Sequence, residues 1–362
     1  MTHKRLISTL TLTFCLLFSV VAQIPTGYYN AANGLTGFPL KTALYNIIKG
    51  HTIISYDNLY DKYIKTDVIP PNTVWDMYSH NPTGTTAYTY TYGTGDECGS
   101  YNSEGDCFNR EHSVPASWFN DASPTYSDLF VVYPTDGYVN NIRSNYPFGE
   151  VLSPTFTSTN GSKRGSCSYP GYSGTVFEPI DAYKGDFART LFYLATRYEN
   201  TIATWYSNTA EAANALVANN TVCFQTWHLN MLYEWHVSDP VSAKEIARND
   251  SVYKIQHNRN PYIDHPEWVA VIWNMPTTAA NFDLSEKIRI FPNPADDAMQ
   301  ISIPDISSTY QITITDITGR MISQIVMSTE NQMVDISMLT KGMYLLVLEN
   351  NNTRIVKNFI KN

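Results

Sequence analysis

The sequence predicts an α+β fold, with a mixed, helix-rich N-terminal unit followed by a small β-sandwich-like module. Its 362 residues correspond to about two domains at roughly 150 residues each. Hydrophobic residues make up 43% and charged residues 16%, which excludes a disordered, collagen-like or coiled-coil chain. Near Ser285 the apolar pattern changes from helical spacing to short alternating runs. We therefore place the two domains at residues 23–285 and 286–362.

The N-terminus predicts a cleaved secretory signal peptide over residues 1–22. Lys4 and Arg5 precede an apolar run, and small residues stand before Gln23. A membrane anchor is the alternative, but the run is short and contains Ser and Thr, and no later stretch approaches the ~20 apolar residues of a span. We expect a secreted protein without a membrane span, found outside the cell or at the cell surface.

Export affects how the cysteines are interpreted, because disulfides persist in oxidising compartments. Cys15 leaves with the signal peptide, which leaves Cys98, Cys107, Cys167 and Cys223. Cys98–Cys107 would close a short loop and Cys167–Cys223 would follow, although four cysteines allow three pairings. A zinc site is less expected, because no pair has the usual spacing of two to four residues.

The N-terminal unit contains three predicted helices. Apolar spacing predicts a helix over 40–48 and an amphipathic helix over 186–198. A third follows Asp239 and Pro240, which resemble an N-cap and a first-turn proline. Residues 81–105, rich in Gly, Thr and aromatic residues, predict loops and short strands.

The C-terminal module is predicted to be all-β. Period-two alternation predicts strands over 299–303, 310–315, 321–326 and 344–348. A carbohydrate-binding or adhesive β domain would show the same pattern.

The residues that suggest chemistry lie in two runs, 109–115 and 133–145. His112 offers a group for proton transfer near neutral pH. Glu111 offers a hard oxygen ligand for Mg²⁺ or Ca²⁺. Taken singly, such a histidine is more often structural and such a glutamate a solvated surface charge. Together with nearby carboxamide and guanidinium groups, they suit metal-assisted attack on a phosphate.

A short helix is predicted from Thr135 or Asp136 to a stop at Pro147. Residues three and four apart share a helix face, so Asp136, Asn140 and Arg143 can line one side. Asparagine is a mediocre interior helix residue, so Asn140 is either exposed or a ligand.

The spacing of Glu111 and His112 raises one difficulty. If residues 109–114 form a regular strand, adjacent side chains point to opposite faces and the two cannot serve one site. Pro115 favours an irregular backbone there.

An ordered set of motifs resembles the endonuclease I family, secreted or periplasmic nucleases of the His-Me finger (ββα-metal) class. The matching segments are Phe108–Glu150, Phe177–Pro179, Lys184–Asp186 with Ala188–Arg189, and Asn258–Pro261. The resemblance spans most of residues 40–270 and implies a ββα-metal core within the α+β fold. Relatives with His and Asn after the Asp-hydrophobic pair differ from this chain, which has Phe130 and Val131 after Asp128–Leu129.

The resemblance also implies roles for residues. It implies His112 as general base, Glu111 and Asn140 as ligands of one divalent ion (Mg²⁺, or Ca²⁺ or Mn²⁺), and Arg143 near the phosphates. Because the formal net charge is −9, a polyanion must be held by the ion and by local cations. The candidate substrate-binding cations are Arg110, Lys184, Arg189 and Arg259.

The expected function is a secreted, metal-dependent endonuclease that hydrolyses DNA with little sequence specificity, RNA being a second candidate substrate. We expect a monomer. One alternative is a non-catalytic binding or adhesion protein on the same scaffold. Another is a phosphodiesterase acting on small nucleotides or teichoic-type polymers.

The C-terminal module also resembles a known family. Ile290–Pro294, Gly342–Tyr344 and Lys357 are similar to the C-terminal sorting domain of type IX secretion substrates. This resemblance implies that the module is recognised by the secretion machinery.

Overall fold

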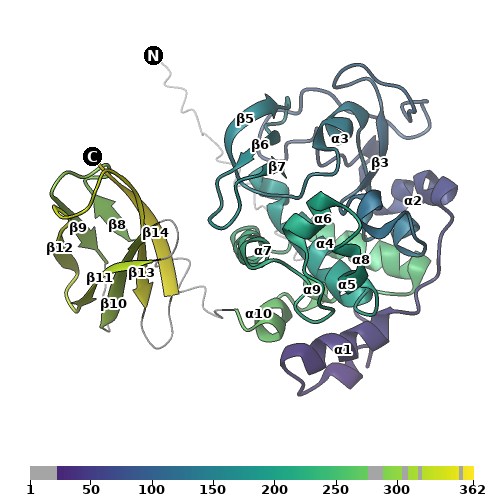
Figure 1. Cartoon of the computed structure of the whole chain (residues 1–362). Coiled ribbons are helices and arrows are strands. Elements are labelled where there is room, and N and C mark those ends of the chain that lie inside the picture. The colour runs from purple at the N-terminus through teal and green to yellow at the C-terminus, as the bar shows by residue number, and fades with distance from the viewer. Residues whose placement is uncertain (1–22, 276–287, 304–308, 317–319, 350–353) are drawn as a thin grey trace, which may run out of the picture.

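The structure is a computed structural model that describes residues 23–275, 288–303, 309–316, 320–349 and 354–362 (Figure 1). The predicted signal peptide and the predicted boundary after Ser285 lie outside the described residues. Within these ranges no helix has the length and apolar character needed to cross a bilayer.

Two separate hydrophobic clusters form the cores of the two units. One cluster gathers buried residues between Tyr29 and Trp273, and the other gathers residues between Ile288 and Phe359. The N-terminal unit and the C-terminal module therefore each have a core of their own.

Helices predominate in the N-terminal unit (Figure 1). The α-helices are α1 (Gly37–Ile48), α2 (Leu59–Thr66), α3 (Gly137–Arg143), α4 (Lys184–Arg197), α5 (Ile202–Trp205), α6 (Ala210–Ala215), α7 (Thr226–Ser238), α8 (Ala243–Gln256), α9 (Pro261–Asp264) and α10 (Trp268–Trp273). Short 3₁₀ helices are η1 (Asn30–Ala32), η2 (Tyr56–Asn58), η3 (Ala116–Phe119), η4 (Thr125–Ser127) and η5 (Asp181–Tyr183).

Three small antiparallel sheets accompany these helices. They are β1 (Val68–Ile69) with β2 (Thr73–Val74), β3 (Phe108–His112) with β4 (Val132–Asp136), and β5 (Val151–Thr157), β6 (Lys163–Cys167) and β7 (Thr175–Glu178) in that order. In residues 81–105, all of which are described, the chain forms loops with isolated bridges such as Thr73 to Thr91. The predicted loops are confirmed, and the predicted short strands there are reduced to single bridges.

The predicted helices are confirmed with two corrections. Helix α1 buries Leu40, Leu44 and Ile48, the apolar face that predicted it. Helix α4 is confirmed with its amphipathic pattern, but its polar face is buried as well, because all 14 of its residues are buried. Its polar residues can be buried because they find partners on neighbouring elements, since an unpaired buried charge is costly.

The start of the third predicted helix is also corrected. The N-cap of α8 is Ser242, whose side chain accepts the N–H of Glu245 in a capping box. Asp239 instead follows α7, and its Oδ2 accepts the N–H of Gly185 at 2.8 Å. A carboxylate there stabilises the N-terminal end of α4.

One of the two expected disulfides is present. Cys98 is bonded to Cys107, but Cys167 and Cys223 are free and buried. The Sγ of Cys167 accepts the N–H of Tyr169, whereas the Sγ of Cys223 lies 3.2 Å from the carbonyl oxygen of Asn220. The expected second pair is therefore wrong, because each thiol packs among its own neighbours.

The C-terminal module consists of two sheets. Four strands lie in the order β11 (Met321–Met327), β10 (Tyr310–Asp316), β13 (Gly342–Glu349) and β14 (Arg354–Lys361), and three in the order β12 (Asn331–Asp335), β9 (Ala298–Ser302) and β8 (Arg289–Phe291). Alternate side chains from both sheets, among them Ile301, Ile312 and Leu346, form one cluster. The sandwich-like arrangement agrees with the alternation in the sequence.

Candidate active site

The two runs that suggested chemistry form one compact unit of two strands and a helix. Strands β3 and β4 pair antiparallel, with Glu111 opposite Tyr133 and His112 opposite Val132. Helix α3 begins at Gly137, directly after the last residue of β4. The predicted short helix is confirmed, although it ends at Arg143, before Pro147; Asp136 is its N-cap, and the Oδ1 of Asp136 accepts the N–H of Val139 at 2.8 Å.

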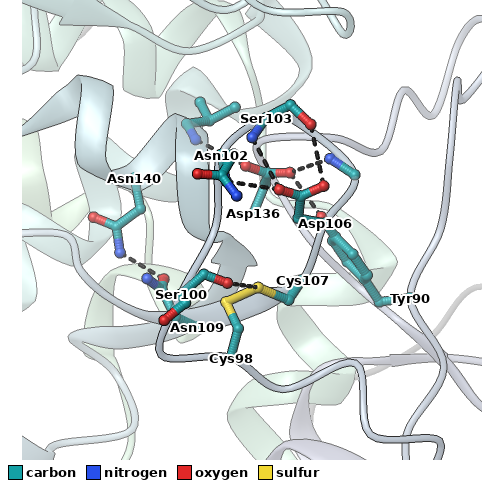
Figure 2. Close-up of a disulfide and its surroundings, with 12 residues drawn as sticks. Tyr90, Cys98, Ser100, Asn102, Ser103, Asp106, Cys107, Asn109, Asp136 and Asn140 are labelled. Carbon is teal, nitrogen blue, oxygen red and sulfur yellow. Dashed lines mark hydrogen bonds between the residues drawn. A yellow bond between two sulfur atoms is a disulfide. The ribbon is translucent and has the colours of Figure 1, made fainter.

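Asp136 also attaches a distant loop to this unit. Its Oδ2 accepts hydrogen bonds from the hydroxyls of Tyr88 and Tyr90 and from the N–H of Gly105, at 2.7–2.9 Å. The Cys98–Cys107 disulfide lies beside it (Figure 2). A Cβ at Gly137 would lie 2.7 Å from the ring of Tyr101 and 3.0 Å from the Sγ of Cys98, so the start of α3 tolerates only glycine without a shift. The loop thus fixes the end of α3 that precedes Asn140.

One face of β3 packs against α3. The Nδ2 of Asn140 donates to the Oδ1 of Asn109 at 2.8 Å, as Figure 2 shows. Arg143, one turn further along α3, donates from Nη1 to the carbonyl oxygen of His112 and from Nη2 to that of Ser113, at 2.8 and 2.6 Å. These bonds hold the helix against the end of the strand.

Glu111 is buried on this face and was predicted as a metal ligand. Its Oε1 accepts the hydroxyl of Tyr78 at 2.9 Å and lies 3.2 Å from the Nη1 of Arg143. Burial raises the pKa of Glu111 to about 7, against the opposing effect of Arg143. The Oε2 atom accepts no hydrogen bond from the described residues.

The opposite face of β3 is aromatic and carries His112. The imidazole stacks on Tyr126 and Tyr56, with ring centroids 4.8 and 5.7 Å away, and touches Phe119. Its Nε2 lies 3.0 Å from the carbonyl oxygen of Tyr126. Because a carbonyl oxygen only accepts, Nε2 carries the hydrogen and Nδ1 keeps its lone pair. Burial lowers the pKa of His112 to about 4, so the ring is neutral at pH 7.

Arg110 shares this aromatic face. Its guanidinium lies 3.7 Å from the ring centroid of Tyr56 and 4.7 Å from that of Tyr60, and Nη1 donates to the carbonyl oxygen of Tyr56. The side chain is 20% exposed and lies 3.8 Å from exposed Asp57. Arg110 is therefore near the surface beside His112.

The sequence predicted that a regular strand would point Glu111 and His112 to opposite faces, and the structure has this regular strand. Residues 108–112 form a regular strand, and Glu111 and His112 have different neighbours on its two faces. Arg143 contacts Glu111 and the carbonyl oxygen of His112, and Asn140 contacts Asn109, but the side chains of Glu111 and His112 lie on opposite faces of the strand. The irregular backbone that Pro115 favoured is therefore not present at residues 108–112.

Comparison with known proteins identifies the N-terminal unit. The family model of endonuclease I matches residues 36–267. The chain belongs to the endonuclease I family. An extracellular ribonuclease of Bacillus amyloliquefaciens is 35% identical over 251 residues, 68% of this chain and 78% of that protein. An extracellular ribonuclease of Bacillus subtilis (strain 168) is 34% identical over the same shares.

The C-terminal residues 289–362 match the model of the secretion system C-terminal sorting domain. A solved structure of PorZ, a surface component of the type IX secretion system of Porphyromonas gingivalis, is 18% identical to this chain. The match covers 24% of this chain and 13% of PorZ. Its TM-score is 0.20, and we draw nothing from it. This endonuclease I family member is a secreted nuclease that carries a sorting domain.

Three predicted substrate-binding cations of the nuclease are buried and lie in ion pairs. The Nζ of Lys184 is 2.9 Å from Glu178 and 2.8 Å from Asp181, and the Nη2 of Arg189 is 2.8 Å from Glu245. Arg259 pairs with Asp264 at 2.6 Å and with Asp250 at 2.7 Å. Their charges are matched by carboxylates, and none of their contacts reaches Glu111, Asn140 or His112.

The oxygen atoms left beside α3 suit a hard divalent cation. The amide of Asn140 directs its nitrogen to Asn109, which leaves its Oδ1 as an acceptor, and Asn109 lies two residues before the buried Glu111 on the same face of β3. Mg²⁺ keeps several waters and is typically held by one or two protein oxygens. The described residues contain no group of three or more His, Cys, Asp and Glu side chains that could hold a metal. A site with one carboxylate and one amide fits both observations.

Several residues of this site had no recognisable signal in the sequence. Tyr78 and Tyr126 contact Glu111 and His112 but are two of 26 tyrosines. The Tyr126 group that matters is a backbone carbonyl, which every residue has. Asn109 lies inside the run that was singled out, and its position two residues before Glu111 on a strand could have placed it on the same face.

Proposed function

We propose that this protein is a metal-dependent endonuclease that hydrolyses phosphodiester bonds of DNA and RNA, as a monomer and with little sequence specificity. We also propose that β3, β4 and α3 form a ββα-metal (His-Me finger) core. The observation that carries the proposal is the hydrogen bond from the Nε2 of His112 to the Tyr126 carbonyl, which leaves a neutral Nδ1 as a base.

RNA is included because the two curated relatives bear the name extracellular ribonuclease. Substrates of both kinds share the phosphodiester group, and the residues proposed to act contact only phosphate, water and metal. A site that contacts the backbone and not the base edges carries little sequence information.

In the proposed mechanism, Glu111 and Asn140 hold one divalent ion, which when bound offsets negative charge on the phosphate. The Nδ1 of His112 accepts a proton from the attacking water while the Tyr126 carbonyl keeps the imidazole oriented. As the water oxygen bonds to phosphorus, the bond from phosphorus to the 3′ oxygen breaks, and that oxygen takes a proton from solvent while His112 returns its own proton to solvent. No covalent intermediate with the protein is needed.

Arg143 has a positioning role in this mechanism. It is 2% exposed, and its Nη1 and Nη2 atoms are occupied by Glu111 and by the carbonyl oxygens of His112 and Ser113. It therefore orients the Glu111 side chain and fixes the backbone at His112. Arg110, which is partly exposed beside His112, is the proposed phosphate contact among the predicted cations.

The test is cleavage of plasmid DNA and of RNA by the chain from Gln23, with Mg²⁺, Ca²⁺ or Mn²⁺ and with a chelator. We expect metal-dependent cleavage that His112→Ala abolishes and His265→Ala, a change at a partly exposed histidine, leaves intact. Circular dichroism checks that His112→Ala folds. Cleavage in the presence of chelator would contradict metal dependence, and absence of cleavage under every condition would favour a binding protein. Sequence-restricted products from random DNA would contradict low specificity.

A further inference from the structure

A cavity of about 710 Å³ lies next to the aromatic face of β3. It is lined by the C-terminal ends of α1 and α4, by α5, and by Phe119, Asn120 and residues 122–125, while Asp121 between them does not line it. Ligand sites in proteins have volumes of roughly 300–1,000 Å³. The cavity is therefore large enough for a small organic ligand, and the proposed mechanism does not use it.

The charge of the lining differs from that of the whole chain. The chain has 33 Asp and Glu residues against 24 Lys and Arg, yet none of the residues that line the cavity is Asp or Glu. Lys49 and Arg197 are its two cations. A concave site lined by one sign of charge attracts an anion.

Arg197 is the buried cation of this lining. It is 6% exposed, and its Nε donates to the Nδ1 of His51 at 2.9 Å. Its Nη1 and Nη2 atoms donate to no acceptor in the described part of the chain. Other buried arginines, such as Arg189 and Arg259, are matched by carboxylates. Arg197 therefore presents two unused donors in the geometry that binds phosphate bidentately.

Aromatic rings form another part of the wall. Trp205 lies between Phe119 and Tyr198, with ring centroids 5.4 and 5.7 Å away, and Tyr45 is half-buried on the α1 side. Phe119, Tyr198 and Trp205 are 2–5% exposed, so half-buried Tyr45 is the lining ring with the most free surface. Nucleic acid bases stack on aromatic rings whatever their sequence. The combination of rings with free cationic donors matches a nucleotide better than it matches an inorganic anion.

The cavity and His112 share a wall. The ring of Phe119, which lines the cavity, lies 5.9 Å from that of His112. Thr125 also lines the cavity, and the next residue, Tyr126, holds the Nε2 of His112. A strand with its phosphate at His112 therefore has the cavity beside it.

We propose that this cavity binds one unpaired nucleotide of the substrate, with a phosphate on Arg197 and Lys49 and the base against the aromatic rings. This inference rests on the proposed nuclease function and specifies its substrate class. Because a paired base cannot leave its duplex to enter the cavity without an unstacking cost, the enzyme prefers single-stranded nucleic acid.

The kinetic test compares a single-stranded oligonucleotide of about ten nucleotides with a dinucleotide that has only the scissile phosphate. Lys49→Gln removes a cation at the rim, Thr204→Trp fills the cavity from an exposed position, and Arg197→Gln removes the buried donors. Arg320→Gln in the C-terminal module is the matched charge control.

We expect the cavity variants to raise KM for the oligonucleotide on the order of tenfold, the effect of losing one stacked base, while kcat/KM for the dinucleotide changes less than about twofold. Arg197→Gln needs a thermal unfolding control because the side chain is buried. The two variants at exposed positions keep the test valid if Arg197→Gln does not fold.

Calorimetric titration with a nucleoside monophosphate and with inorganic phosphate, in the presence of chelator, tests the cavity without catalysis. We expect the nucleotide to bind more tightly than phosphate, and Thr204→Trp to abolish its binding. Equal affinity for both, or binding that all three variants retain, overturns the inference. If the wild type cleaves and KM is unchanged in every variant, the cavity proposal fails while the nuclease proposal stands. If the wild type does not cleave, the nuclease proposal fails and the titration still decides the cavity.

Discussion

The two faces of strand β3 differ in chemistry although they alternate residue by residue. Asn109 and Glu111 face α3, where oxygen atoms and Arg143 surround them. Arg110 and His112 face Tyr56 and its neighbouring rings. In the proposed mechanism, one face would supply ligands for a cation, and the other would supply a neutral base. Two residues adjacent in the sequence, Glu111 and His112, are therefore positioned by contacts from different parts of the fold.

The largest effects are expected from one substitution on each face of β3, at Glu111 and at His112. Glu111→Gln removes the carboxylate ligand, so we expect Mg²⁺ binding to be lost and cleavage to fall about 10³-fold. His112→Ala removes the base, so cleavage falls about 10²–10⁴-fold while Mg²⁺ still binds. Calorimetric Mg²⁺ titration and single-turnover cleavage measure both. Equal loss of Mg²⁺ binding in the two variants would contradict the separation.

His228 is a second buried histidine with a lowered pKa, but it has no part in the proposed mechanism and can therefore be compared with His112. Its Nδ1 lies 3.3 Å from the carbonyl oxygen of Ala215, but its Nε2 is buried without a partner. Burial lowers the pKa of His228 to about 4. The unfolded chain binds this proton near pH 6.5 and the folded protein does not, so the free energy of unfolding falls as pH drops from 6.5 to 4, by up to about 3 kcal/mol.

We expect His228→Leu to make that pH dependence shallower and to leave kcat unchanged. Urea unfolding between pH 4 and 7 measures the slope, with cleavage assayed at pH 7. An unchanged slope would show that His228 does not titrate as described, and a loss of kcat would contradict its structural role.

The disulfide tests whether the α3 face depends on the loop before it. Cys98→Ser with Cys107→Ser removes a crosslink of about ten residues, so we expect a loss of about 2–3 kcal/mol in the free energy of unfolding. Because the loop packs on Gly137, Mg²⁺ affinity should fall as well. Cys167→Ala, at a buried free cysteine, is the matched control. Unchanged Mg²⁺ affinity in the folded double variant would separate the loop from the site.

The smallest expected effect concerns the aromatic face. Tyr56→Leu removes the ring stacked on His112 and under Arg110, so we expect kcat to fall about tenfold, a cost of ~1.4 kcal/mol, with Mg²⁺ affinity unchanged. Tyr206→Leu, at an exposed tyrosine, should have no effect. A change in Mg²⁺ affinity in Tyr56→Leu would mean that the two faces are not independent.

Features encoded locally were predictable from the sequence. The apolar spacing of α1, the start of α3 near Asp136 and the alternation in the C-terminal strands each depend on residues a few positions apart. The same holds for the proximity of Asn140 and Arg143, which lie one turn apart on α3.

Features that depend on distant partners were not predictable. The burial of α4 requires Glu245 and other carboxylates contributed by later segments, so Arg189 looked like a free cation in the sequence. The hydrogen bond that sets the tautomer of His112 comes from a backbone carbonyl, which leaves no mark in a sequence. The pairing of Tyr78 with Glu111 joins residues 33 positions apart across loops without regular spacing.

No residue separates β4 from α3, so the rotation of the α3 side chains about the helix axis is fixed relative to β4. Strand becomes helix at one peptide bond, and Asp136 belongs to both. One residue inserted between Asp136 and Asn140 would rotate every later side chain by about 100° and carry Asn140 and Arg143 away from β3. The loop over residues 81–105 reaches the same corner through the hydroxyls of Tyr88 and Tyr90 and the N–H of Gly105, which all bond to Asp136. Changes in length should therefore be excluded between Asp136 and Asn140.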